Sequence, residues 1–271
     1  MSRLLNSGGL WSKRLVRSLT GGLQRKCCFI HIPKCAGTSL NLALTAACGL
    51  RQRHNRIASI PSRRSAAVLY GVRSDELFSD LDDADKTYRA VFDHREALMM
   101  YALAAGDSVV SGHFLYSDRA FRAFGDRYGF ITVLRPPGPR MISHYSYIHA
   151  TGEFEGSLDD YLKTNLARRH GSEITRYLCG TPDRREDELA DALVLAKENL
   201  RNFAAVGFTD KMDAFAGDFE AAFGTPLKIP RRNVSQGAKP ALTAEQSAAL
   251  KRIGGVDQEL YDWARATFKR S

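Results

Sequence analysis

Residues 29–40 read FIHIPKCAGTSL, an apolar run that ends at a short turn and continues as an amphipathic segment. Residues 27–32 have the β-branched and aromatic side chains of a buried parallel strand, and a proline follows them directly. Gly37 permits a backbone that other residues would strain, and Thr38 and Ser39 are good N-cap residues for the apolar positions that follow. The stretch therefore predicts a strand, a loop and a helix in that order.

Such a helix would begin where the strand's carboxyl end delivers the chain, so its free N–H groups point into the turn. A helix N-terminus of this kind is an anion site. Lys34 adds a positive charge and the hydroxyls of Thr38 and Ser39 add donors, which favours a phosphate group. In P-loop nucleotidases the Lys follows the last Gly of G-x-x-x-x-G-K-[ST], whereas Lys34 precedes Gly37, and this order argues against ATP and Mg²⁺. A βα turn with a surface lysine is the alternative that this stretch alone leaves open.

A second stretch has the same organisation. Residues 130–135 (FITVLR) predict another buried strand, which residues 136–139 (PPGP) end. Residues 140–148 (RMISHYSYI) predict the helix that follows. Arg135 is thus expected at a strand's carboxyl end, and Ser143 lies eight residues further on, in the helix.

Together the two stretches resemble the PAPS-dependent sulfotransferases, specifically the carbohydrate group that includes heparan sulfate 2-O-sulfotransferase and its bacterial relatives. In that family H-x-P-K-[TC]-[GA]-G-T-S binds the 5′-phosphosulfate, and an Arg followed by a Ser eight residues later binds the 3′-phosphate. The resemblance implies that Arg135 and Ser143 bind the 3′-phosphate. Pro136 replaces the family's usual Asp or Asn, a departure that concerns the turn more than the charge of Arg135. The residues implied for the 5′-phosphosulfate are Lys34, Cys35, Ala36, Gly37, Thr38 and Ser39.

Three further segments extend the resemblance over roughly residues 26–268. Residues 111–114 (SGHF) are similar to the family's G-H segment, whose His is the proposed catalytic base, which implies that role for His113. Residues 206–210 (VGFTD) resemble its V-G-x-[ST]-[ED] strand end. A late loop, RNVS, resembles the family's nucleotide-contacting loop and implies such contacts for Arg232, Asn233 and Ser235.

Length and charge set the broad class. The 271 residues suffice for one large α/β domain or two small ones, and one domain is the better interpretation. Lys and Arg exceed Asp and Glu by 39 − 30 = 9, which suits an anionic cofactor and is compatible with an anionic acceptor. Nucleic acid is the competing partner, but the basic residues are dispersed and no helix-turn-helix, zinc-finger or RNP-like pattern is present. We expect a three-layer α/β/α domain with a mainly parallel sheet in residues 26–271, as in the P-loop nucleotide hydrolase-like sulfotransferases.

The five cysteines lack C-x-x-C spacing, so neither a disulfide framework nor a zinc site is indicated, and a reducing compartment is expected. Cys35 could be a thiol activated by the helix N-terminus and Lys34, but a small residue that fills the loop is the preferred interpretation. Residues 1–25 form a basic leader without a signal or membrane-spanning run, whereas Golgi members of the family usually carry an anchor. This predicts a cytoplasmic, bacterial-type protein. Weak peripheral membrane contact and a disordered or packed leader are both open for residues 1–25.

The remaining chain supplies fewer functional signals. Residues 51–95 are charged and poorly periodic, and predict either part of the acceptor rim or a solvated connector. Residues 96–105 predict a core helix, and residues 203–208 another buried strand. A short strand at residues 108–111 places His113 at its carboxyl end.

The other histidines are weaker candidates. His144 and His149 lie on the helix after the second motif and are weaker candidates for the base than His113. His31 is expected to point toward packing. Nothing in the sequence singles out His170.

These inferences lead to one functional hypothesis, transfer of a sulfuryl group from PAPS to a hydroxyl of a sugar or glycolipid. His113 would take the acceptor proton, and Lys34 would neutralise the charge that grows on the leaving phosphate. No metal is needed, because the lysine and the helix N-terminus supply the positive charge. The alternatives are a P-loop-type kinase that uses ATP and Mg²⁺, and a non-catalytic protein of the same fold that binds an anionic ligand.

Overall fold

A computed structural model describes residues 22–71, 84–182, 186–230 and 241–268. Its strands form one sheet in the order β2-β3-β1-β4-β5, and every neighbouring pair is parallel. Because all the strands are parallel, the loops that follow them open at the same edge of the sheet, and the strand order reverses at β1, where such folds place a ligand crevice. The strands are β1 (Lys26–Ile30), β2 (His54–Ile57), β3 (Val109–Gly112), β4 (Tyr128–Leu134) and β5 (Ala205–Phe208).

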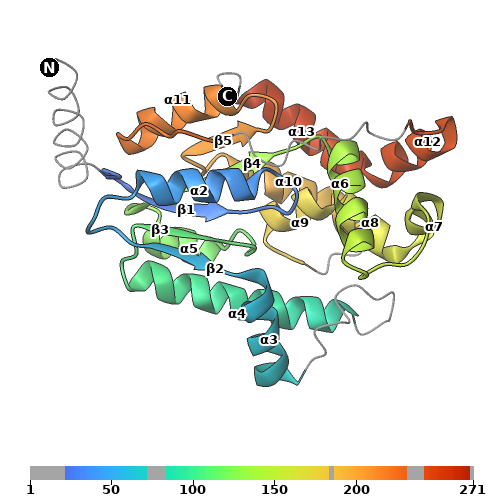
Figure 1. The fold of residues 1–271 in the computed structure, drawn as a ribbon, viewed down its shortest axis with the longest axis horizontal. Coiled ribbons are helices and arrows are strands. Elements are labelled where there is room, and N and C mark those ends of the chain that lie inside the picture. The colour runs from blue at the N-terminus through green and yellow to red at the C-terminus, as the bar shows by residue number, and fades with distance from the viewer. Residues whose placement is uncertain (1–21, 72–83, 183–185, 231–240, 269–271) are drawn as a thin grey trace, which may run out of the picture.

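Helices cover both faces of this sheet (Figure 1). On one face α2 (Gly37–Ala47) and α11 (Met212–Phe223) bury Leu40, Phe215 and other apolar residues against β1, β4 and β5. The other face carries α4 (Ala84–Ala104), α5 (Asp118–Phe124), α9 (Glu173–Cys179), α10 (Leu189–Leu200) and α13 (Gly255–Thr267). The expected three-layer α/β/α fold with a parallel sheet is confirmed.

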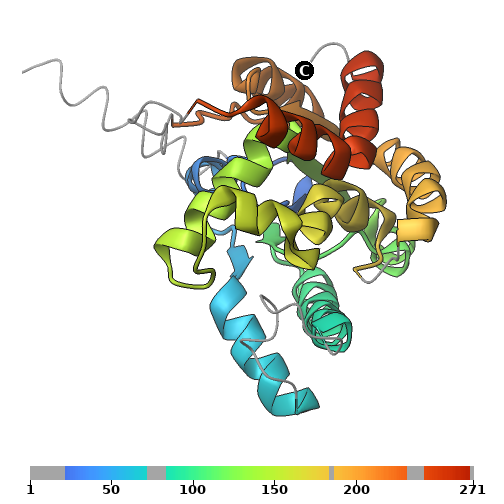
Figure 2. The same cartoon turned by 90° about the vertical axis from the view of Figure 1, so that its right-hand side faces the viewer.

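The remaining helices lie around the carboxyl edge of the sheet. A third apolar cluster joins α6 (Pro137–Ala150), α7 (Leu158–Lys163), α8 (Asn165–Gly171) and α12 (Ala244–Ile253). At the N-terminus of α12, Thr243 and Gln246 form a capping box in which the side chain of each accepts from the backbone N–H of the other. Figure 2 shows α3 (Ser59–Tyr70) projecting away from the sheet.

Residues 51–95, for which the sequence left an acceptor rim and a solvated connector open, contain regular elements, and several of their side chains line the cavity described below. This segment holds β2 and α3, and α4 begins at Ala84 rather than near residue 96. β2 was missed because it is four residues long and lies at the sheet edge, where burial imposes no apolar pattern. The strands predicted at residues 27–32, 108–111, 130–135 and 203–208 are all present within two residues of those bounds.

Part of the predicted basic leader is packed against the domain. Leu23 is buried beside α11, and Arg25 donates hydrogen bonds to the carbonyl oxygens of Gly125 and Tyr128. Residues 1–21 lie outside the described residues. Within the described ranges, none of the helices has both the length and the apolar character needed to cross a membrane.

Candidate active site

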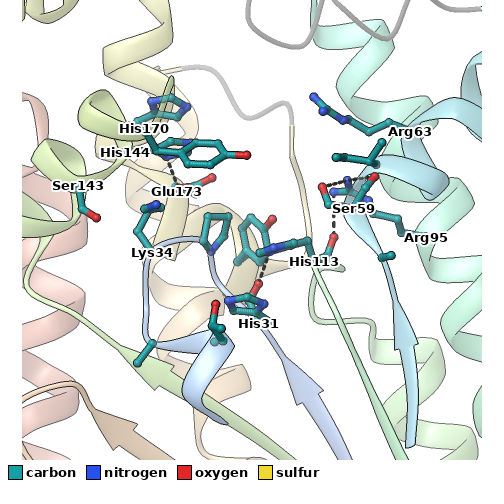
Figure 3. Close-up of a pocket in the computed structure, with 18 of the residues that line it drawn as sticks. His31, Lys34, Ser59, Arg63, Arg95, His113, Ser143, His144, His170 and Glu173 are labelled. Carbon is teal, nitrogen blue, oxygen red and sulfur yellow. Dashed lines mark hydrogen bonds and ion pairs between the residues drawn. The ribbon is translucent and has the colours of Figure 1, made fainter. Parts of the chain in front are cut away.

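A cavity of about 760 Å³ opens at the carboxyl edge of the sheet (Figure 3). Residues that follow all five strands contribute to its lining, from Ala58 after β2 to Thr209 after β5. It brings together most of the residues that the sequence predicted for the site, namely Lys34, Ala36, Gly37, Thr38, Ser39, His113, Arg135 and Ser143. Arg232, Asn233 and Ser235 lie outside the described residues.

The loop between β1 and α2 exposes unpaired backbone donors to this cavity. α2 begins at Gly37, so Thr38 and Ser39 lie in its first turn and are not its N-cap, contrary to the prediction. The N-cap is Ala36, which adopts a left-handed backbone with φ of 56° and offers no side chain to the free N–H groups. No acidic residue lies in the first turn. These donors are therefore available to an external anion.

Gly37 is required here for a reason other than backbone freedom. Its φ is not positive, whereas Lys34 and Ala36 are the left-handed residues of the loop. A Cβ on Gly37 would lie 1.6 Å from Nε2 of His31. The absence of a side chain thus lets the His31 ring lie directly on the first residue of the helix.

Two cationic side chains adjoin the loop. Lys34 Nζ lies 4.4 Å from the centroid of the Tyr147 ring. Burial, together with the neighbouring charge of Arg135, lowers the pKa of Lys34 from its ordinary value. Arg135 donates from Nη1 to the carbonyl oxygen of Lys34 at 3.2 Å, which ties the end of β4 to the loop.

α6 begins immediately after Arg135. Pro136 is its N-cap, and Pro137 occupies the first helical position, where a missing N–H costs nothing. Pro136 provides no side-chain cap, so the capping oxygen of an Asp or Asn at this position is lost. Ser143 lies further along α6 and lines the same cavity as Arg135.

His113 presents an unprotonated nitrogen to the cavity. Its Nδ1 lies 2.8 Å from the carbonyl oxygen of His31, and because a carbonyl only accepts, Nδ1 carries the hydrogen. Burial, reinforced by His31 and Arg95, holds the pKa of His113 well below its ordinary value. The ring is therefore neutral near pH 7, and its Nε2 has a free lone pair without a hydrogen-bond partner in the described part of the chain.

His31 belongs to the site, whereas the sequence analysis expected it only to pack. Its ring stacks on His113, with centroids 4.1 Å apart and planes at 29°, and on Phe29 below it. Burial, with Arg56 and Lys34 adding to it, lowers the pKa of His31 to about 4. The candidate anion-binding turn and the candidate base are thus in contact through one side chain.

A polar cluster on α6, α8 and α9 forms another wall that the sequence did not reveal. His144 and His170 stack with centroids 3.7 Å apart. Glu173 Oε2 accepts from the fully buried Arg140 and lies 3.5 Å from Nδ1 of His144. Burial by itself raises the pKa of Glu173, but Arg140 and His144 outweigh it and hold that pKa below its ordinary value. The carboxylate is therefore ionised inside the cavity.

A buried guanidinium lies on the opposite side of His113 (Figure 3). Arg95 is 5% exposed and donates to the carbonyl oxygen of His113 at 3.0 Å and to Ser59 and Ser62 at the start of α3. Among the described residues Arg95 forms no ion pair with a carboxylate. Arg63 lines the cavity beside it.

Cys35 does not line the cavity. It is buried beneath the loop, and burial raises the pKa of its thiol to about 12 despite the neighbouring arginines. This favours the loop-filling interpretation over the reactive thiol. The described residues contain no group of three or more His, Cys, Asp or Glu side chains arranged to hold a metal ion.

Comparison with known proteins adds no assignment to this site. No protein-family model matches the chain, and no curated protein is significantly similar to it. The sulfotransferase resemblance therefore depends on the motifs and on the chemistry of the cavity.

Proposed function

We propose that this chain is a sulfotransferase that moves a sulfuryl group from PAPS to a hydroxyl of a carbohydrate or glycoconjugate. One observation carries the proposal: the neutral His113 turns a free Nε2 toward the cavity that also holds Lys34 and the uncapped N-terminus of α2. A base beside an anion site suits a reaction in which a hydroxyl attacks an anionic donor.

The cavity's charges fit the two anionic ends of such a nucleotide. The N–H groups at the start of α2, with Lys34, would hold the 5′-phosphosulfate. Arg135 follows the neighbouring strand β4, Ser143 lies on α6, and together they would hold the 3′-phosphate. Arg232, Asn233 and Ser235 stay predicted contacts to the nucleotide.

The bound PAPS supplies the sulfuryl group. His113 Nε2 accepts the proton of the acceptor hydroxyl as the new oxygen–sulfur bond forms. The bond between sulfur and the phosphate oxygen breaks, and its electron pair stays on the phosphate of the released adenosine 3′,5′-bisphosphate. Lys34 and the first turn of α2 stabilise that growing negative charge, which is the task Mg²⁺ performs in kinases.

The buried Arg95 supports an acceptor that carries an acidic group. A buried guanidinium without a carboxylate partner in the described part of the chain is costly unless a ligand supplies the charge. We therefore favour the anionic alternative for the sugar or glycolipid acceptor. Contact of residues 1–25 with membrane and a cytoplasmic location are proposed on the sequence alone.

The decisive experiment is calorimetric titration with adenosine 3′,5′-bisphosphate in EDTA, with ATP and Mg²⁺ in parallel. Metal-independent binding of the bisphosphate and a weak response to ATP are expected. Preference for ATP and Mg²⁺ would favour a kinase, and binding of neither nucleotide would favour a non-catalytic protein. The order in which Lys34 precedes Gly37 is the feature that speaks against the kinase.

A further inference from the structure

We propose that Glu173 and Tyr177 form an acceptor subsite that recognises two neighbouring hydroxyl groups, one of them beside the hydroxyl that is sulfated; this rests on the proposed function. The two residues are four apart on α9, so their side chains lie on one face of the helix. Both line the cavity. Neither role can be seen in the sequence, because α9 carries no motif.

The two carboxylate oxygens of Glu173 have different surroundings: one binds a buried arginine, and the other is accessible from the cavity. Oε2 holds the fully buried Arg140 and lies near His144. Oε1 has no hydrogen-bond partner in the described part of the chain, and it is not sealed from solvent. Arg140 has a second carboxylate neighbour, because Asp257 Oδ2 lies 3.6 Å from its Nη2. A counter-ion role for Glu173 thus accounts for one oxygen and leaves the other free to accept from a ligand.

Tyr177 offers the complementary group. Its side chain is 4% exposed, yet its hydroxyl has no hydrogen-bond partner among the described residues and is not sealed from the cavity. Burial, with Glu173 and Tyr88 adding to it, raises the pKa of Tyr177 well above its ordinary value. The phenol therefore stays protonated and can both donate and accept.

This pair of groups suits hydroxyls better than phosphates. An ionised carboxylate repels an anion but accepts strongly from an O–H group. A phenol beside it completes the match to two neighbouring hydroxyls, each of which donates and accepts. Phe92 meets the Tyr177 ring edge-on at 5.6 Å and Tyr88 stacks on Phe92 at 6.1 Å, and both line the cavity. They add aromatic surface beside Tyr177, and a guanidinium lies over each ring, that of Arg95 5.2 Å from the Phe92 centroid and that of Arg169 4.4 Å from the Tyr88 centroid.

The test uses the full chain saturated with adenosine 3′,5′-bisphosphate and titrated with methyl glucoside, galactoside, mannoside and glucuronide, followed by the backbone amide NMR signals of α9. At least one glycoside is expected to shift these signals. Glu173→Gln and Tyr177→Phe should each weaken its binding by about tenfold, the usual loss of one hydrogen bond to a buried or charged group. Glu198→Gln on the exposed face of α10 and Tyr101→Phe on α4 are the matched controls and should have no effect.

The outcomes separate this inference from the proposed function. If the wild-type protein does not bind the bisphosphate, the proposed function is refuted. Normal bisphosphate binding with no glycoside shifting the α9 signals, or equal glycoside binding by wild type and both variants, overturns the acceptor subsite alone. Tyr177→Phe leaves the ion pair of Arg140 and Glu173 intact, so it decides the question if Glu173→Gln does not fold. A deoxy analogue of the best glycoside should bind wild type as weakly as the glycoside binds the variant.

Discussion

Replacing Gly37 by Ala tests the contact between the candidate anion-binding turn and the candidate base. An alanine Cβ at this position would lie 1.6 Å from Nε2, 2.0 Å from Cε1 and 2.2 Å from Cδ2 of His31. The ring can move only by leaving its stack between Phe29 and His113. The change should therefore disturb stability, nucleotide binding and the orientation of His113 together.

The expected change in the free energy of unfolding follows from two opposed effects. Alanine is favoured over glycine in a helix interior by about 1 kcal/mol, and less at the first position. Overpacking a rigid site costs about 1–3 kcal/mol. Because φ of Gly37 is not positive, no backbone strain is added. We expect the free energy of unfolding to fall by roughly 1–2 kcal/mol, with a loss of bisphosphate affinity of at least tenfold.

Urea denaturation and calorimetric titration measure the two quantities. Gly217→Ala within α11 is the matched control, because its new Cβ meets nothing within 4 Å and should stabilise the protein slightly. The double variant His31→Ala, Gly37→Ala should lose less stability than the sum of the single changes, since the clash partner is gone. If the Gly37→Ala variant is as stable as the Gly217→Ala variant and binds the bisphosphate with wild-type affinity, the close contact between the His31 ring and Gly37 is refuted.

Three further predictions concern individual side chains. His113→Ala should lower turnover by ~10²–10⁴-fold and leave bisphosphate binding nearly intact, and near-normal turnover in a transfer assay would remove His113 from the mechanism. Arg135→Ala should chiefly weaken bisphosphate binding, and unchanged affinity in calorimetry would reject the second phosphate site. The pKa of His31 is about 4 in the folded state and near 6.5 when unfolded, so the unfolded chain binds more protons and stability falls as pH drops through this range. His31 alone changes the free energy of unfolding by up to about 1.4 kcal/mol per pH unit in this range. His31→Phe should remove this contribution, which urea midpoints compared at neutral and mildly acid pH would measure. An unchanged dependence of stability on pH in the variant would contradict the buried, neutral ring.

Local sequence patterns predicted most of the sheet and the strand, turn and helix that form the first candidate anion site. The apolar runs of β1, β3, β4 and β5 are buried on both faces and are therefore recognisable without knowledge of their neighbours. The edge strand β2 escaped detection because half-exposed residues show no such run. The N-cap of α2 was predicted two to three residues late, because Thr38 and Ser39 are typical N-cap residues and Ala36 is not.

The sequence by itself determined that a lysine, a helix N-terminus, an arginine and a histidine follow parallel strands and so meet at one edge. The reason is that strand, turn and helix signals are written within a few adjacent residues. Only the tertiary structure decided that the ring and carbonyl oxygen of His31 contact His113, that the buried Arg95 binds the His113 carbonyl oxygen, and that Glu173 and Tyr177 line the same cavity. Those contacts join segments that are tens of residues apart, and packing alone sets which side chain reaches the cavity.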